Sequence, residues 1–315
     1  MISRLAIAIE AFSARSSAPT GERVAWVDAA KGICIILVVM MHSTLGLGEA
    51  TGREGWLHQV VEFARPFRIP AFFLLSGLFL ARTIDQPWRR YFDRKVLHFV
   101  YFYLLWTVIQ ATVKTLPKEG MEDLLREFAL ALVEPFGTLW FIYILPIFFV
   151  LTKLLRTVPP LLVWTVAAGL QMAQIDTGFT LIDEGCARFV YFYSGYLAAP
   201  YVFRFASVVI EEPTLALSLL LVWAVFEAAV VFSGYSAFPG IGLALGFIGA
   251  LAVVAISTLL STRNWALPIR YAGQNSIVVY LAFFLPMAAT RILLVKSGAV
   301  GGWIDVGTAS LVITA

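Results

Sequence analysis

Charged residues, cysteines and histidines are all scarce in this 315-residue chain. Charged residues make up only 14% of it and hydrophobic residues 60%, whereas a soluble domain is about a quarter charged and about half apolar. This composition excludes a disordered tail, a nucleic-acid-binding arm and an ordinary soluble enzyme. We therefore expect an all-α polytopic membrane protein, with lipids around it and no nucleic-acid partner.

Sulfur and imidazole groups are too few and too scattered for a metal centre or a disulfide framework. The cysteines are Cys34 and Cys186, and the histidines are His42, His58 and His98. No Cys-x-x-Cys or His-Glu-x-x-His pattern is present. We expect no bound metal and no structural disulfide.

Apolar runs long enough to cross a bilayer, about 20 residues each, alternate with helix breakers along the chain. They predict about ten transmembrane helices, of which the last is short. The segments are roughly 24–46, 60–81, 96–113, 136–155, 158–175, 186–203, 213–233, 238–260, 274–295 and 303–315. The last run stops in mid-pattern, so either the chain is truncated there or this helix does not span.

Lysine and arginine residues lie mostly on one side of the predicted topology. With the N-terminus inside, the basic stretch 82–95 and most other basic residues fall in cytoplasmic loops, in agreement with the positive-inside rule. We predict a cytoplasmic tail over 1–22 and one transmembrane domain over 23–315. The acidic loop 114–134 is expected to form a short amphipathic helix on the outer surface.

Ionisable residues inside a membrane segment are costly, so each one is a candidate functional residue. In the first segment, Lys31 and His42 are 11 positions apart. They therefore share one face of a helix, about 17 Å apart along its axis. Asp28 can pair with Lys31 on that face. His42 is the candidate general base, and its alternative role is a packing hydrogen bond. Asp28 and Lys31 could instead be interfacial anchors.

Two arginines, Arg65 and Arg68, begin the second segment beside Pro66 and Pro70. Cations next to helix-breaking prolines predict a site for an anion or a polar group, level with the histidine of the first segment. The alternative is a collar at the membrane interface, in which Glu62 pairs with Arg65.

Three further residues are candidates for substrate binding. Glu227 lies in the middle of a segment, where a carboxylate must be protonated or matched by a cation, and it could equally hold helices together. Trp140 also fits an aromatic belt at the membrane interface. Asn275 also fits a hydrogen bond between helices.

Several short motifs follow one another in a fixed order. They are Asp28-x-x-Lys31-Gly32, His42 after a gap of ten residues, Phe72-Phe73-x-x-Ser76-Gly77, Arg94-Lys95, Leu139-Trp140-Phe141, and Gly273-Gln274-Asn275-Ser276 with Tyr280. In this order they resemble the acyltransferase-3 family of integral membrane proteins, from about residue 23 to about residue 295. The stretch Pro66-Phe67-Arg68-x-Pro70 resembles a bacterial subgroup of inner-membrane members, the YcfT-like proteins.

The resemblance implies an O-acyltransferase in a bacterial inner membrane. Such a protein moves an acyl group, often acetyl from acetyl-CoA, onto a hydroxyl of a glycan or glycolipid. The acyl-CoA is then a co-substrate and not a permanently bound cofactor. The essential basic residue and histidine of the family correspond to Lys31 and His42, with Asp28 beside them.

This activity gives the remaining candidates their expected roles. Lys31, Arg94 and Lys95 would bind the phosphates of CoA at the cytoplasmic face. Arg65 or Arg68 would stabilise the oxyanion or hold the acceptor while the histidine takes the proton of the hydroxyl.

Two departures from the family pattern keep other functions open. Lysine stands at 31, where arginine is common, and it lacks the bidentate guanidinium fork. Phe283 stands where a histidine is common. A transporter or flippase for a lipid-linked or small glycan fits the buried charges and paired prolines as well, and an inactive membrane partner fits the phenylalanine. Nothing in the sequence favours a particular oligomeric state.

Overall fold

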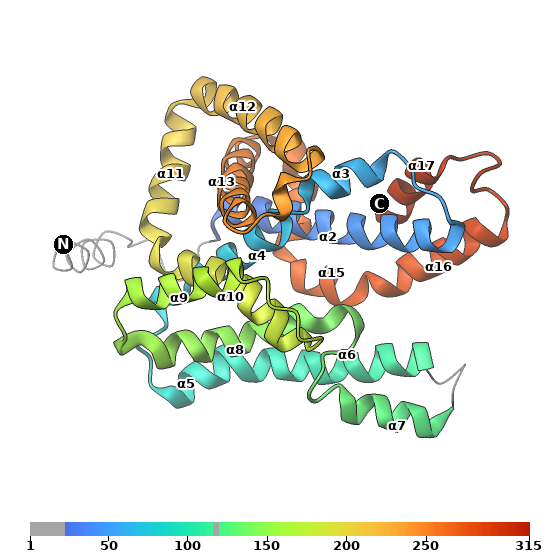
Figure 1. Cartoon of the computed structure of the whole chain (residues 1–315), viewed down its shortest axis with the longest axis horizontal. Coiled ribbons are helices and arrows are strands. Elements are labelled where there is room, and N and C mark those ends of the chain that lie inside the picture. Colours follow the sequence, from blue (N-terminus) through green and yellow to red (C-terminus); the bar gives the residue numbers. More distant parts are fainter. Residues whose placement is uncertain (1–22, 116–119) are drawn as a thin grey trace. The chain divides into compact units, whose positions relative to one another are not determined.

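The computed structural model describes residues 23–115 and 120–315, so the predicted tail over 1–22 lies outside the described residues. Within these ranges the regular structure is helical, apart from one isolated bridge between Val300 and Ile304. The predicted all-α class is confirmed. The chain forms two compact units (Figure 1). The first combines the N-terminal part up to Leu75 with Ala198–Ala315, and the second is Ser76–Leu197.

The first unit is built around helix α2 (Ala25–Thr51). In chain order its other helices are α3 (Leu57–Ala64), α4 (Arg68–Gly77), α11 (Ala199–Glu211), α12 (Pro213–Phe232), α13 (Ile241–Ser261), α14 (Leu267–Gln274), α15 (Ser276–Ala282), α16 (Phe284–Lys296) and α17 (Val306–Thr314). The 3₁₀ turns η5 (Tyr235–Ala237) and η6 (Asn264–Ala266) precede α13 and α14. The last two residues of α4 belong to the second unit.

Helix α2 is the centre of the first unit and contacts α3 and each helix from α13 to α17. An acidic residue in its first turn, Asp28, is favourable beside the positive end of the helix dipole. The helix ends at Gly52, which adopts a positive φ of 64° and donates its N–H to the carbonyl of Gly48. Glycine takes this left-handed cap without steric cost. One uninterrupted helix therefore carries Asp28, Lys31 and His42.

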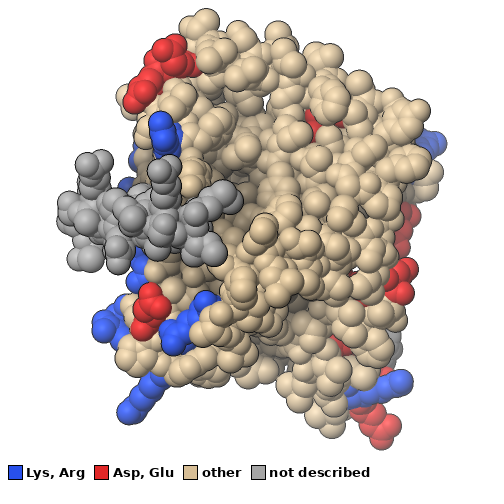
Figure 2. Space-filling model, turned by 60° about the vertical axis from the view of Figure 1, so that its left-hand side comes forward, with Lys and Arg blue, Asp and Glu red and all other residues tan. Residues whose placement is uncertain are grey.

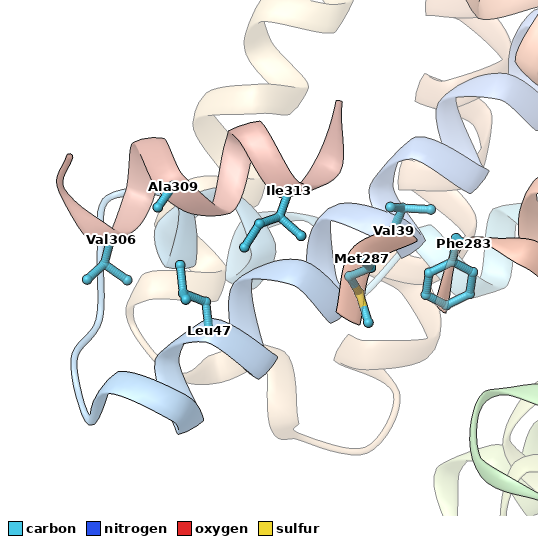
Figure 3. Close-up of a cluster of buried hydrophobic side chains, with 7 residues drawn as sticks. All are labelled: Val39, Leu47, Phe283, Met287, Val306, Ala309 and Ile313. Atoms are coloured by element: carbon cyan, nitrogen blue, oxygen red, sulfur yellow. The ribbon is translucent and has the colours of Figure 1, made fainter. Parts of the chain in front are cut away.

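A buried apolar cluster fastens the C-terminal half of α2 to the last helices of the chain (Figure 3). Its members are Val39, Leu47, Phe283, Met287, Val306, Ala309 and Ile313. For each large side chain among them, burial is worth about 1.5–3 kcal/mol relative to exposure to water. Phe283 stands at the junction of α15 and α16, which are bent by 47° relative to each other. The cluster therefore holds Phe283 beside α2.

The second unit is a smaller helical bundle. Its helices are α5 (Trp88–Phe92), α6 (His98–Thr115), α7 (Met121–Leu130), α8 (Trp140–Leu154), α9 (Pro160–Met172) and α10 (Thr180–Leu197). The short turns are η1 (Leu80–Arg82), the π-helical η2 (Asp93–Leu97), η3 (Gly137–Leu139) and η4 (Leu155–Thr157). Helix α6 packs on α7 and α8, and α10 packs on α8 and α9. Helix α7 is the helix predicted within the acidic loop 114–134.

The described residues contain fewer membrane-length helices than the ten predicted. Five are long and apolar enough to cross a bilayer, and up to seven if each bent pair counts as one span. The five are Ala25–Thr51, Trp88–Thr115, Gly137–Thr157, Pro213–Phe232 and Ile241–Ser261. The bent pairs are Leu57–Ala64 with Arg68–Arg82, and Ser276–Ala282 with Phe284–Lys296.

The three predicted segments that fall short do so for different reasons. Segment 158–175 forms α9, a helix of only 13 residues. Segment 186–203 divides between α10 and α11, and α10 carries three charged residues, Asp183, Glu184 and Arg188. Segment 303–315 forms α17, a helix of 9 residues.

Exposed apolar side chains agree with a membrane setting. Helix α12 presents many of them, namely Leu215, Leu217, Leu219, Leu221, Val222, Val225, Phe226 and Phe232. On the face drawn in Figure 2, uncharged residues form a broad expanse, and most of the visible charged side chains gather near its margins. An apolar surface of this extent is stable in lipid and costly in water. The protein is a multi-pass membrane protein.

Candidate functional site

Helices α2 and α14 cross where each contributes a glycine. A Cβ atom on Gly32 would lie 2.0 Å from the carbonyl oxygen of Ile269, and one on Gly273 would lie 1.7 Å from the carbonyl oxygen of Asp28. Only a residue without a side chain allows such an approach. The two glycine-containing motifs noted in the sequence therefore meet at this crossing.

The crossing determines the surroundings of Asp28. Its side chain is 9% exposed and accepts a hydrogen bond from Nε2 of Gln274, 3.2 Å from Oδ2. Lys31, one turn further along α2, is half-buried. No ion pair joins Asp28 to Lys31 in the described part of the chain. Gln274 thus holds the Asp28 carboxylate by a hydrogen bond, and Asp28 acts on Lys31 by charge. Sequence reasoning missed Gln274, although its position within the Gly273–Ser276 motif was a signal for it.

His42 lies further along the same face of α2 and is half-buried. Its ring centroid is 5.3 Å from that of Phe283, with the two rings inclined at 33°. Phe283 itself is 5% exposed and belongs to the buried cluster of Figure 3. Contact with a fixed aromatic ring restricts the rotamers of the imidazole. The phenylalanine that departs from the family pattern is therefore in direct contact with the candidate base.

Arg65 and Arg68 lie in different environments. The chain bends by 45° between α3 and the helix beginning at Arg68, as the flanking prolines predicted. The Arg65 side chain is 71% exposed and pairs with Glu62 at 3.3 Å, the geometry of the alternative interfacial collar. Arg68 is buried and donates to the carbonyl of Val61 at 2.9 Å. Of the two, Arg68 is the one in a position to act inside the protein.

Glu227 is completely buried on α12. The indole N–H of Trp223 donates to its Oε2 at 3.2 Å, whereas Oε1 is buried and has no hydrogen-bond partner in the part of the chain that the structure describes. Trp223 packs edge-on against Phe63 and Phe67, with ring centroids 5.6 and 5.4 Å away. Glu227 is thus attached to an aromatic cluster that joins α12 to α3 and to the bend between α3 and α4.

Asn275 has a local role in the backbone. It separates α14 from α15, and its Nδ2 donates to the carbonyl of Tyr271 at 2.9 Å. This bond caps the end of α14, where carbonyl groups lack helical partners. The predicted interhelical hydrogen bond is therefore made by the preceding residue, Gln274.

The other predicted site residues belong to the second unit. Trp140 is half-buried at the start of α8, edge-on to Phe141 with ring centroids 6.2 Å apart. Arg94 is exposed in the π-helical turn η2. Lys95 follows it, and its Nζ lies 4.8 Å above the ring of Phe149. Arg94 is consequently the more accessible of the two predicted phosphate ligands in this unit.

A buried lysine of the second unit was missed from the sequence. Lys153 on α8 is 2% exposed. Its Nζ donates to the carbonyls of Ile84 and Gln86, the latter at 2.7 Å, and lies 5.1 Å from the ring of Trp88 and 4.5 Å from that of Tyr91. The sequence does not predict this burial, because a lysine near a helix end usually extends toward water.

Comparison with known proteins gives this arrangement a family. Residues 24–315 match the model of a family described as an acyltransferase domain. The inner membrane protein YcfT of Escherichia coli (strain K12) is 25% identical over 153 residues, which cover 41% of this chain and 43% of that protein. The nodulation protein NolL of Mesorhizobium japonicum is 29% identical over 162 residues, which cover 49% of this chain and 42% of NolL.

Each of these two matches therefore spans less than half the length of the relative. No solved structure matches the chain. The match of the family model, in contrast, extends over nearly the whole sequence, including α2 and the helices that contact it. The chain belongs to the acyltransferase-3 family.

Proposed function

We propose that this protein is an O-acyltransferase of the bacterial inner membrane, with its N-terminus in the cytoplasm. It transfers an acyl group, acetyl in the simplest case, from an acyl-CoA to a hydroxyl of a glycan or glycolipid. One observation carries the proposal: His42, half-buried and packed on Phe283, shares a helix face with Lys31 inside a domain that matches the acyltransferase family.

His42 is the general base of the proposed reaction. The hydroxyl oxygen of the acceptor attacks the thioester carbonyl carbon, and an imidazole nitrogen of His42 takes the hydroxyl proton. A C–O bond forms, the C–S bond breaks, and CoA leaves as a thiolate that then regains a proton. A buried cation such as Arg68 is suited to stabilise the oxyanion of the tetrahedral intermediate. Glu227 and Trp140 remain candidates for acceptor contacts.

Lys31 is proposed to attract the anionic donor. It lies about 17 Å along the helix axis from His42, a separation that an extended pantetheine arm would span. The crossing of α14 contributes by holding the Asp28 carboxylate on Gln274, next to Lys31. Asn275 contributes by ending α14 where this crossing occurs.

Arg94 is proposed as a ligand of the CoA phosphates in the second unit. It is exposed together with Arg89 and Arg90 on adjacent turns, and clustered arginines bind phosphate through charge-assisted hydrogen bonds. Lys95 adds charge, although its contact with Phe149 restrains it. Substitution of Arg94 by glutamine should weaken CoA binding about tenfold, the effect of one such bond. The difference in affinity between wild type and variant should be smaller at high salt.

The experiment that tests the base is a comparison of two histidine variants in purified protein. His42→Ala should lower acyl transfer from acetyl-CoA by about 10²- to 10⁴-fold, as expected for loss of a general base. His98→Ala removes an exposed histidine of α6 and should leave the rate unchanged. Product mass and release of free CoA thiol are both measured. If folded His42→Ala protein transferred acetyl at the wild-type rate, the proposal would be wrong.

A flippase is the second candidate, and the two bent spans support it. They break at 45° and 47°, and interrupted helices are common at the binding sites of transporters. A flippase moves its cargo without consuming a thioester. Measurement of glycan movement into vesicles, with and without acetyl-CoA, separates the two functions, because only the acyltransferase releases CoA thiol.

A further inference from the structure

An open pocket between α2 and α16 in the first unit has a largely apolar lining with three charged side chains in it. Its volume is about 440 Å³, within the range of about 300–1,000 Å³ of small-molecule sites. Its lining residues are Gly46, Glu49, Ala50, Arg291, Ile292, Val295 and Lys296. None of them is among the predicted site residues.

The geometry of Arg291 depends on the glycine opposite. Its Nη1 donates to the carbonyl of Gly46 at 3.1 Å, and a Cβ atom on Gly46 would lie 2.4 Å from that nitrogen. A guanidinium carries five N–H donors. The bond to Gly46 therefore fixes the position of the group and uses one donor, which leaves others for a ligand.

The charges in the pocket favour an anionic ligand. Arg291 and Lys296 supply two cations, and Glu49 supplies one carboxylate. The excess of positive charge attracts an anion, and the carboxylate accepts hydrogen bonds from hydroxyl groups. A hydroxylated molecule that carries one acidic group satisfies both, and the apolar part of the lining, from Ala50, Ile292 and Val295, can pack against the carbon face of a sugar ring.

The pocket adjoins His42 along two helices. Gly46 follows His42 by one turn of α2, about 6 Å along the axis. On the facing helices, Arg291 lies two turns beyond Phe283, which contacts the His42 ring. A sugar whose acidic group is bound at Arg291 would thus have its ring on the same face as the candidate base.

We propose that this pocket binds the acceptor, and that the acceptor is an acidic sugar with a carboxylate or phosphate. Arg291 and Lys296 hold the acidic group, Glu49 holds ring hydroxyls, and one hydroxyl is presented toward His42. This inference rests on the proposed acyltransferase function and adds the chemical class of the acceptor to it.

The test compares an acidic acceptor with a neutral one. The wild-type protein in nanodiscs is assayed with acetyl-CoA and either D-glucuronate or D-glucose, and acetylated sugar is measured. We expect preference for D-glucuronate. Arg291→Gln should raise KM for D-glucuronate at least about tenfold, the effect of losing a charge-assisted pair, so that the preference for D-glucuronate over D-glucose is lost.

Matched variants keep the result interpretable. Arg204→Gln removes an exposed arginine of α11 and should leave the KM for both acceptors unchanged. Gly46→Ala should raise the KM for D-glucuronate as Arg291→Gln does. Gly169→Ala, where a Cβ meets nothing within 4 Å, should not raise it. Titration calorimetry in the absence of acetyl-CoA measures the Kd for D-glucuronate directly. Arg291→Gln should raise this Kd even if turnover is slow.

The outcomes separate this inference from the proposed function. If transfer requires His42 but D-glucuronate and D-glucose are used equally by wild type and Arg291→Gln, the acidic-acceptor inference is overturned and the acyltransferase proposal stands. If no sugar is acetylated and His42→Ala changes nothing, the proposed function fails. Loss of D-glucuronate binding when phosphatidylglycerol is added would assign the pocket to a lipid phosphate and overturn the inference.

Discussion

Gly273 of α14 lies against the carbonyl oxygen of Asp28 on α2, so closely that a Cβ atom would come within 1.7 Å of that oxygen. Next to this contact, Gln274 donates to the Asp28 carboxylate. One backbone approach thus brings together two motifs separated by more than two hundred residues. The position of the charged end of the site depends on it.

Replacement of Gly273 by alanine should therefore force the two helices apart. Overpacking of this kind costs about 1–3 kcal/mol, and the backbone oxygen has no rotamer by which to move away. Thermal unfolding in detergent should shift down by several degrees, and acetyl-CoA binding should weaken. Gly169→Ala is the control, since its Cβ would enter open space. Equal unfolding temperatures for the two variants would contradict the close crossing.

Helices and their apolar faces were predictable from the sequence, but contacts between distant motifs were not. The face shared by Lys31 and His42 follows from helical periodicity alone. In contrast, Gln274 could not be chosen over Asn275, because periodicity does not say which of two adjacent amides faces a partner helix. The contact of Phe283 with His42 likewise depends on the bend between α15 and α16.

The number of spans was overestimated for a related reason. Hydropathy detects apolar runs, but it does not detect where a helix ends inside one. Segment 186–203 was read as one span, although α10 ends at Leu197 and α11 begins at Ala199. A helix that packs within a protein and one that crosses lipid can be equally apolar, and length distinguishes them only when the ends are known.

Substitution of Phe283 by alanine should impair catalysis more than substrate binding. The ring packs on His42 at a centroid distance of 5.3 Å, and its removal leaves the imidazole free to adopt other rotamers. Small misplacements of a catalytic group cost up to about a hundredfold in rate. We expect kcat to fall about ten- to a hundredfold, with the Kd for acetyl-CoA unchanged.

The matched control is Phe232→Ala, which removes an exposed phenylalanine from α12 and should leave kcat unaltered. Steady-state kinetics and calorimetric binding of acetyl-CoA are measured on both variants. A fall in donor affinity without a change in kcat would show that Phe283 does not position the base.

Substitution of Lys153 by methionine should destabilise the second unit. The ammonium donates to the carbonyls of Ile84 and Gln86, and methionine fills similar space without donors. The buried carbonyl of Ile84 and the partly buried carbonyl of Gln86 then lose this partner, at about 1–3 kcal/mol for the buried one. Limited proteolysis should become faster in the loop after η1. Arg156→Ala removes only an exposed ion pair with Asp85 and should cost less than about 1 kcal/mol. Similar proteolysis rates in both variants would exclude a structural role for Lys153.

The turn before α10 should make stability depend on pH in acid. The pKa of Asp183 is held below its usual value chiefly by the backbone N–H of Thr177, 2.8 Å from Oδ1. The Thr177 hydroxyl and the Gly178 N–H, at 2.8 and 3.0 Å, add to this effect. Because the folded pKa is the lower one, the stabilisation is present above the unfolded value, about 3.9, and is lost as the pH falls through the folded value.

Asp183→Asn removes this charge and therefore this part of the pH dependence. At neutral pH the variant should unfold at a lower temperature than wild type, because an amide cannot accept from Thr177 and Gly178 at once as the carboxylate does. As the pH falls below the folded pKa, the two proteins should converge, since wild type has then gained the proton that cancels the advantage. Unfolding temperatures measured from pH 7 down to pH 2.5 test this. A difference that stays constant over the range would mean that the Asp183 charge contributes nothing and that only the shape of the side chain matters at this turn.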